Sequence, residues 1–186
     1  MNRVCVYAGS SLGASPAYAA AARAFGRACA GRGLGIVYGG GGAGLMGELA
    51  DAALVAGGEV IGVIPRAMIA AERAHRHVTE LIPVESMHER KRRMADLADA
   101  FVALPGGIGT LEEVIEILTW AQLGLHAKPV GLLDADGFYT LLRAFLAHQR
   151  DEQFLAPAHH ALLAVEDDAE RLLDQLSDRL SDRRGR

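Results

Sequence analysis

The sequence predicts an α/β fold, an open and mostly parallel sheet of about six or seven strands with helices on both faces. Two observations carry this prediction. Short apolar runs alternate along the chain with longer amphipathic or alanine-rich stretches, the order typical of strands joined by helical crossovers. Glycine-rich turns directly follow several of the short runs, as is common where a parallel strand ends.

The composition is that of a single globular domain. The chain has 186 residues and a hydrophobic fraction of 51%, enough to bury a substantial core. No repeat or linker interrupts it, so residues 1–180 are expected to form one domain and residues 181–186 a frayed, disordered tail. The net charge of −4 gives no argument for nucleic acid or an anionic membrane, and no apolar run is long enough to cross a bilayer.

The cysteines and the first residues favour a cytoplasmic protein. Cys5 and Cys29 lie in apolar runs and are too few for a disulfide framework. Met1 leads directly into the first strand pattern, which leaves no room for a signal peptide. A reducing cytoplasm is therefore the expected compartment.

The first part of the chain is expected to form three strands and two helices. Ser15 and Pro16 fit the N-cap and first position of a helix that Gly33 ends. The expected strands are residues 3–8, 34–38 and 59–64, and the expected helices are residues 16–32 and 45–56.

The rest of the chain repeats this alternation. Pro83 interrupts one predicted strand, which should therefore be irregular or close to an edge of the sheet. Ser86 with Glu89 forms a candidate capping box for the next helix. The expected strands are residues 80–84, 101–104, 129–133 and 162–165; the expected helices are residues 87–98, 110–125, 137–150 and 168–180, with a short helix and loop at 67–77.

The segment FVALPGGIGTLEE, residues 101–113, predicts an anion site. It reads as a buried strand, a glycine loop and a helix N-terminus, where backbone N–H groups and the helix dipole favour a phosphate. Parallel sheets bind ligands beyond the carboxyl ends of their strands. The loops at residues 9–11 and 39–44 are expected at the same edge as the loop at 105–109.

The sequence around Glu113 fits two roles for this carboxylate. Thr110 followed three residues later by Glu113 fits a capping box, which would make the carboxylate purely structural. Glu112 and Glu113 also come directly after the loop, where a site that binds only phosphate has little use for acids. The spacing alone does not decide between a structural and a chemical role.

The second glycine loop resembles a dinucleotide fingerprint only in part. Gly39, Gly41 and Gly44 match G-x-G-x-x-G. The acid expected near the end of the following strand is missing, and the loop follows the second strand rather than the first. We therefore expect no nicotinamide cofactor, and part of this loop serves tight turns and helix packing.

Histidines and lysines predict neither a metal nor another cofactor. The pairs His75 with His77 and His159 with His160 lack the spacing of helical metal ligands. Of the two lysines, Lys128 directly precedes a strand that opens with proline, a poor place for a Schiff base. No cofactor is expected.

Arg90 is expected to point inward. In the predicted helix 87–98 it shares the apolar face with Met87 and Met94, and a buried arginine is costly unless an anion meets it. The partner would be a substrate phosphate or Glu113, or else Arg90 belongs to an internal ion pair. The neighbouring basic residues, Lys91, Arg92 and Arg93, are expected to form a solvated patch.

Three motifs together resemble the Lonely Guy family of phosphoribohydrolases, long mislabelled as lysine decarboxylases. Residues 105–113 fit PGGxGTxxE, residues 87–91 (MHERK) fit a companion motif, and residues 40–47 (GGGAGLMG) fit a third. The resemblance extends from Arg3 to about Val165. It implies a Rossmann-like homodimer that hydrolyses an N6-modified adenosine 5′-monophosphate to the free base, a cytokinin or adenine, and ribose 5-phosphate.

The resemblance also implies roles for single residues. Its catalytic pair falls on Arg90 and Glu113, and Glu72 is a further acidic contact by a looser match. Ser10 and Gly40, in the two earlier loops, are expected to join the site. The implied substrate-binding residues are Glu72, Arg90, Lys91, Gly106, Gly107, Ile108, Gly109, Thr110, Leu111, Glu112, Glu113, Thr119, Ser10 and Gly40.

The implied chemistry suits these residue types. Cleavage of an N-glycosidic bond builds positive charge on the ribose, which a carboxylate stabilises directly or by activating water. Arg90 can keep Glu113 ionised and in place. The competing function is a non-catalytic nucleotide or cofactor carrier on the same fold, in which Glu113 would only cap its helix.

The sequence further predicts a homodimer. The helix expected at residues 110–125 carries apolar residues on more than one face, and only one face can pack on the sheet. These residues are Leu111, Val114, Ile115, Ile117, Leu118, Trp120 and Leu123.

Overall fold

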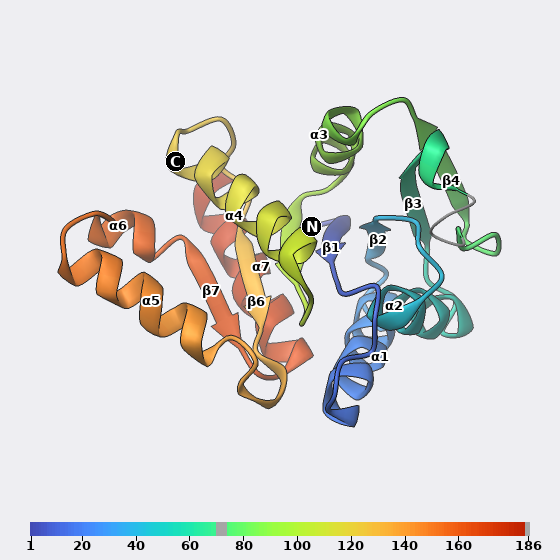
Figure 1. Ribbon diagram of the computed structural model, residues 1–186, viewed down its shortest axis with the longest axis horizontal. Helices are drawn as coiled ribbons and strands as arrows, with labels where there is room; N and C mark the ends of the chain where they lie inside the picture. Colours follow the sequence, from blue (N-terminus) through green and yellow to red (C-terminus); the bar gives the residue numbers. More distant parts are fainter. Residues whose placement is uncertain (70–73, 185–186) are drawn as a thin grey trace.

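The computed structural model describes residues 1–69 and 74–184. Within them seven strands form one sheet in the order β4-β3-β2-β1-β5-β6-β7, with every neighbouring pair parallel (Figure 1). This confirms the predicted fold class. The strands are β1 (Arg3–Tyr7), β2 (Gly35–Tyr38), β3 (Val60–Pro65), β4 (Glu80–Val84), β5 (Ala100–Ala103), β6 (Val130–Leu133) and β7 (Leu163–Glu166).

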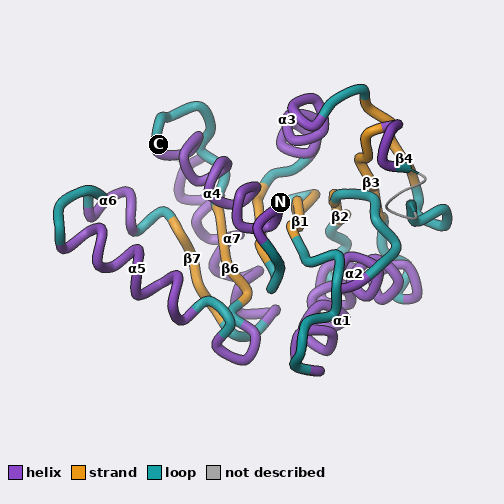
Figure 2. Tube along the Cα trace, viewed as in Figure 1, coloured by secondary structure: helices purple, strands orange, loops and turns teal. Residues whose placement is uncertain are grey.

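Helices cover both faces of this sheet. Figure 2 shows the strands as a central row from β7 on the left to β4 on the right, with helices on either side. The helices are α1 (Pro16–Gly31), α2 (Gly44–Val55), α3 (Met87–Leu97), α4 (Ile108–Gln122), α5 (Thr140–Asp151), α6 (Pro157–His160) and α7 (Ala169–Arg184), with short 3-10 turns η1 (Arg66–Met68) and η2 (Ala135–Gly137).

Two apolar cores lie on opposite faces because side chains alternate along each strand. On one face Val4 and Val6 of β1 pack in a cluster with residues of α1, α2 and α7. On the other face Cys5 and Tyr7 pack in a cluster with Met94 of α3 and residues of α4. The candidate site lies on this second face.

The strand order places a switch point between β1 and β5. The chain runs from β1 outward to β4 and then returns to the opposite side of β1. The loops after β1 and β5 meet there, and the Gly9 N–H donates to the Pro105 carbonyl over 3.0 Å. Ligands of open parallel sheets commonly bind at this point.

Two expected helix caps are confirmed, and the capping reading of Glu113 is ruled out. The Ser15 hydroxyl caps α1 at Ala17, and the Ser86 hydroxyl accepts from the Glu89 N–H over 3.1 Å. The capping box that Thr110 and Glu113 could have formed is absent from α4, which starts earlier, has Gly107 as its N-cap and receives no side-chain cap. Glu113 therefore does not cap this helix.

Strand β4 and helices α6 and α7 bear on three further expectations from the sequence. Pro83 lies in β4, which is an edge strand as predicted. The short helix α6, which begins at Pro157, was not predicted. Helix α7 continues to Arg184, so the tail expected from Ser181 is helical as far as the structure describes it.

Candidate active site

Arg90 is fixed by backbone carbonyls at the carboxyl end of the sheet. It lies in the first turn of α3, and its side chain is only 8% exposed. Its Nε–H donates to the Val63 carbonyl over 3.1 Å, and Nη2 donates to the Gly39 carbonyl over 3.0 Å. The prediction that Arg90 points inward is confirmed, with two partners that the sequence did not suggest.

Glu113 faces the remaining nitrogen of this guanidinium. Its carboxylate Oε1 lies 3.8 Å from Nη1 of Arg90, and the Glu113 side chain is 13% exposed. The distance is too long for a direct hydrogen bond but still within the range of an ion pair, here between two largely buried groups. Because α3 and α4 supply one member each, the pair depends on how these helices pack on β1 and β5.

The glycines of residues 106–109 have two different tasks. A Cβ atom on Gly106 would overlap the Thr110 side chain and approach the Gly9 nitrogen, so this position requires glycine for packing. A Cβ on Gly107 or Gly109 would meet nothing within 4 Å. The space above these two residues is therefore open to a ligand.

The start of α4 presents backbone donors to this open space. Gly107, Ile108 and Gly109 are exposed, whereas Thr110 is buried. The first N–H groups of a helix have no intrahelical partner, and the dipole adds partial positive charge there. Phosphate would thus bind about one and a half turns of helix before Glu113.

Lys91 links α3 to α4. The prediction that it lies in a solvated basic patch is wrong. Its Nζ contacts Glu112 Oε1 at 2.6 Å and Glu116 Oε2 at 2.9 Å, and its side chain is 14% exposed. Burial lowers the pKa of Lys91, but the hydrogen bonds to Glu112 and Glu116 outweigh this and raise it. Arg92 and Arg93 are exposed, as predicted.

A buried phenol lies on the same face of the sheet as this pair. Tyr7 is 4% exposed and stacks on Phe101. Burial raises the pKa of Tyr7 well above its ordinary value, and the negative charges of Glu113 and Glu116 raise it further. Tyr7 therefore stays neutral and adds no charge to this face of the sheet.

Other predicted site residues are placed differently. Ser10 is exposed and lines a pocket of about 260 Å³ with Gly106 and Gly107 at the switch point. Gly40 is buried with a φ of 78°, and its carbonyl accepts from the His75 N–H. Glu72 lies outside the residues that the structure describes.

Thr119 and Leu111 are not brought to the pair of Arg90 and Glu113. They line an apolar groove of about 360 Å³ between α4 and α5, together with Ile115 and Phe145. Residues four apart share a helix face, so Leu111, Ile115 and Thr119 form one stripe that is separate from Glu113. Within a single chain the predicted binding residues thus fall into two groups.

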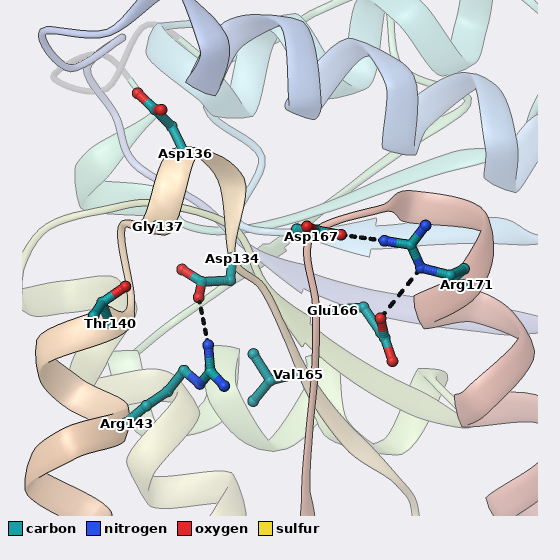
Figure 3. Close-up of a pocket in the computed structure, with 9 residues that line it drawn as sticks. All are labelled: Asp134, Asp136, Gly137, Thr140, Arg143, Val165, Glu166, Asp167 and Arg171. Carbon is teal, nitrogen blue, oxygen red and sulfur yellow. Dashed lines mark hydrogen bonds and ion pairs between the residues drawn. The ribbon is translucent and has the colours of Figure 1, made fainter.

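A third hollow, of about 670 Å³, contains none of the predicted site residues (Figure 3). Most of its charged groups pair with one another: Arg143 contacts Asp134 at 3.1 Å, and Arg171 contacts Glu166 and Asp167. The remaining carboxylate, Asp136, accepts from the Ser15 hydroxyl. Asp134 also accepts from the Tyr139 N–H. These ion pairs link the segments that follow β6 and β7 to helices α5 and α7. The charges therefore serve the fold rather than a ligand.

Residues 1–69 and 74–184 contain no cluster of metal-ligating side chains and no membrane-spanning helix. No group of three or more His, Cys, Asp or Glu side chains in that part of the chain is arranged to hold a metal ion. None of the helices described there is long and apolar enough to cross a membrane.

Comparison with known proteins identifies the family. A family model described as "Possible lysine decarboxylase" matches residues 46–176. A relative from Oryza sativa subsp. japonica, named a probable cytokinin riboside 5′-monophosphate phosphoribohydrolase, is 50% identical over 95% of this chain and 78% of its own length. The chain belongs to the Lonely Guy family. An Arabidopsis thaliana member, named a cytokinin riboside 5′-monophosphate phosphoribohydrolase, is 45% identical over 95% of this chain and 82% of its own.

Solved structures with the same fold include proteins that are not named phosphoribohydrolases. The molybdenum cofactor carrier protein of Chlamydomonas reinhardtii aligns with a TM-score of 0.73 and 23% identity, covering 97% of this chain and 98% of that one. The molybdenum cofactor binding protein of Rippkaea orientalis aligns with a TM-score of 0.70 and 24% identity, covering 95% and 96%. At these identities the likeness concerns the fold alone.

Proposed function

We propose that the protein hydrolyses the N-glycosidic bond of an N6-modified adenosine 5′-monophosphate, releasing the free base and ribose 5-phosphate. The observation that carries the proposal is the buried pair of Arg90 and Glu113 next to the exposed glycine start of α4. The names of the Lonely Guy relatives, which specify cytokinin riboside 5′-monophosphates, support the substrate class.

The proposed mechanism divides binding from bond cleavage. The phosphate binds the N–H groups at the start of α4 and its binding energy orients the ribose. As the bond from C1′ to the base nitrogen breaks, the base takes the electron pair and positive charge develops on the ribose. The Glu113 carboxylate stabilises that charge or takes a proton from the attacking water. The water oxygen bonds to C1′, and the proton that the water loses ends on the departing base nitrogen, directly or by way of Glu113.

Arg90 supports Glu113 in this mechanism. Two of its nitrogens are bound to the carbonyls of Val63 and Gly39, so the guanidinium cannot turn away. Nη1 lies 3.8 Å from Oε1 of Glu113 and places a fixed positive charge beside the carboxylate. This fixed charge costs no reorganisation during the reaction, which is how preorganised sites lower a barrier.

The test is base release from AMP and from an N6-alkylated AMP, followed by chromatography of base and ribose 5-phosphate. Both nucleotides should yield equimolar base and sugar phosphate, and adenosine should react poorly because it lacks the phosphate. A protein that binds AMP and leaves it intact would instead be a nucleotide carrier, which is the second candidate function on this fold.

The functional unit in this proposal is a homodimer in the cytoplasm. The groove between α4 and α5 contains exposed apolar side chains, among them Leu111 at 40% and Phe145 at 56% exposure. A second copy would cover these surfaces and bury Thr119, the predicted binding residue that lies there. The free thiols of Cys5 and Cys29 are buried and suit a reducing compartment.

A further inference from the structure

His75 joins the connection between β3 and β4 to helix α2. Its ring is 8% exposed, and Nε2 lies 2.8 Å from Oδ1 of Asp51, whose side chain is 69% exposed. The other ring nitrogen, Nδ1, accepts from the His77 N–H over 3.3 Å. A neutral ring that accepts at Nδ1 carries its proton on Nε2, so His75 donates to Asp51.

The backbone of the same segment holds the glycine loop after β2. The His75 N–H donates to the Gly40 carbonyl over 3.0 Å, and Ala74 forms an antiparallel bridge with Gly41. Gly40 adopts a φ of 78°, a conformation that few other residues tolerate. These contacts fix a loop that has little stiffness of its own.

The loop in turn holds Arg90. The Gly39 carbonyl, one residue before Gly40, accepts the hydrogen bond of Nη2 of Arg90. A shift of the loop would move this carbonyl and leave one donor of a buried guanidinium without its partner. Small displacements of a positioned charge have large effects on rate.

We propose that His75, held by Asp51, is a positioning residue that fixes the Gly39–Gly41 backbone and through it the Arg90 guanidinium. The inference rests on the proposed function and adds two residues that do not touch the substrate. The chain of contacts runs from Asp51 to His75, from His75 to the loop, and from the loop to Arg90.

The kinetic test uses Asp51→Ala, because an exposed carboxylate on a helix surface can be removed without loss of the fold. We expect kcat for AMP hydrolysis to fall about fivefold with KM within about twofold, since the start of α4 is untouched. Asp51→Asn keeps an acceptor at Oδ1 and should restore most of the rate. Glu48→Ala is the matched control, because it removes a carboxylate one turn away that pairs with Arg23.

A second measurement does not need catalysis. The Arg90 Nη2–H donates to the loop carbonyl of Gly39, so its ¹⁵N NMR signal should exchange slowly with solvent and should exchange several-fold faster in Asp51→Ala. If the wild-type protein released no base, the proposed function would fail while this measurement still tested the contacts. Unchanged Arg90 exchange in Asp51→Ala, or a rate loss no larger than that of Glu48→Ala, would overturn the inference.

Discussion

The guanidinium of Arg90 occupies the space that a side chain on Gly39 would need. A Cβ atom on Gly39 would overlap Nη2 of Arg90, the same nitrogen that binds the Gly39 carbonyl. Gly39 is therefore required for its lack of a side chain and not for an unusual backbone conformation. Two residues far apart in the sequence thus constrain each other directly.

Gly39→Ala should displace Arg90 and reduce activity. We expect kcat to fall at least about tenfold, with the free energy of unfolding lowered by about 1–3 kcal/mol, because the added methyl overpacks a buried site. Steady-state kinetics and urea unfolding measure the two effects. Gly31→Ala is the control, since a Cβ there meets nothing within 4 Å; equal behaviour of the two variants would contradict the assignment.

Glu113→Gln should remove the charge that acts on the ribose while keeping the shape of the side chain. We expect kcat to fall by about two orders of magnitude, about 3 kcal/mol of transition-state stabilisation, with AMP binding largely kept. Calorimetry measures binding, and base release measures the rate. A folded variant that hydrolyses AMP at the wild-type rate would remove Glu113 from the mechanism.

Thr110→Val should weaken binding rather than stability. Thr110 is buried at the third position of α4 and caps nothing, so the loss of stability expected from a missing cap should not occur. Valine has a similar shape but lacks the hydroxyl next to the proposed phosphate. We expect KM for AMP to rise about tenfold with kcat within about twofold. A changed kcat at an unchanged KM would place the hydroxyl in the chemical step instead.

Phe145→Arg should break the proposed dimer. Phe145 is 56% exposed and lines the groove between α4 and α5, so a charge there would be buried without a partner in an apolar interface. Light scattering after size exclusion should show a dimer for the wild type and a monomer for this variant. Val55→Arg, at a residue 90% exposed on α2, should remain a dimer. A wild-type monomer at micromolar concentration would disprove the interface.

The sequence predicted those parts of the structure that repeat a local pattern. The alternation of apolar runs with helical stretches was sufficient for the parallel sheet, and the shared face of Arg90 and Met94 was sufficient for an inward arginine. Both signals come from residues a few positions apart, whose relative directions are set by the period of a helix or strand.

The errors came from patterns whose outcome depends on packing. Thr-x-x-Glu at residues 110–113 matched a capping box, but α4 begins at Ile108 with Gly107 as its N-cap, so Thr110 lies inside the helix. Lys91 read as part of an exposed basic run, yet α3 packs so that it meets Glu112 and Glu116. No local spacing encodes a contact between two helices, and none points to the carbonyls that hold Arg90.

The central place of β1 also sets the order in which the molecule can fold. Val4 pairs with Ile36 of β2 on one side and with Ala100 of β5 on the other. One edge of β1 therefore stays unpaired until β5, which is synthesised much later, is available. Loops of this length close slowly, and an unpaired apolar strand edge invites association with other chains. Arg90 precedes β5 and Glu113 follows it, so the two charges can meet only after that late strand has docked. A nascent chain that stops short of β5 would therefore be both inactive and prone to aggregate.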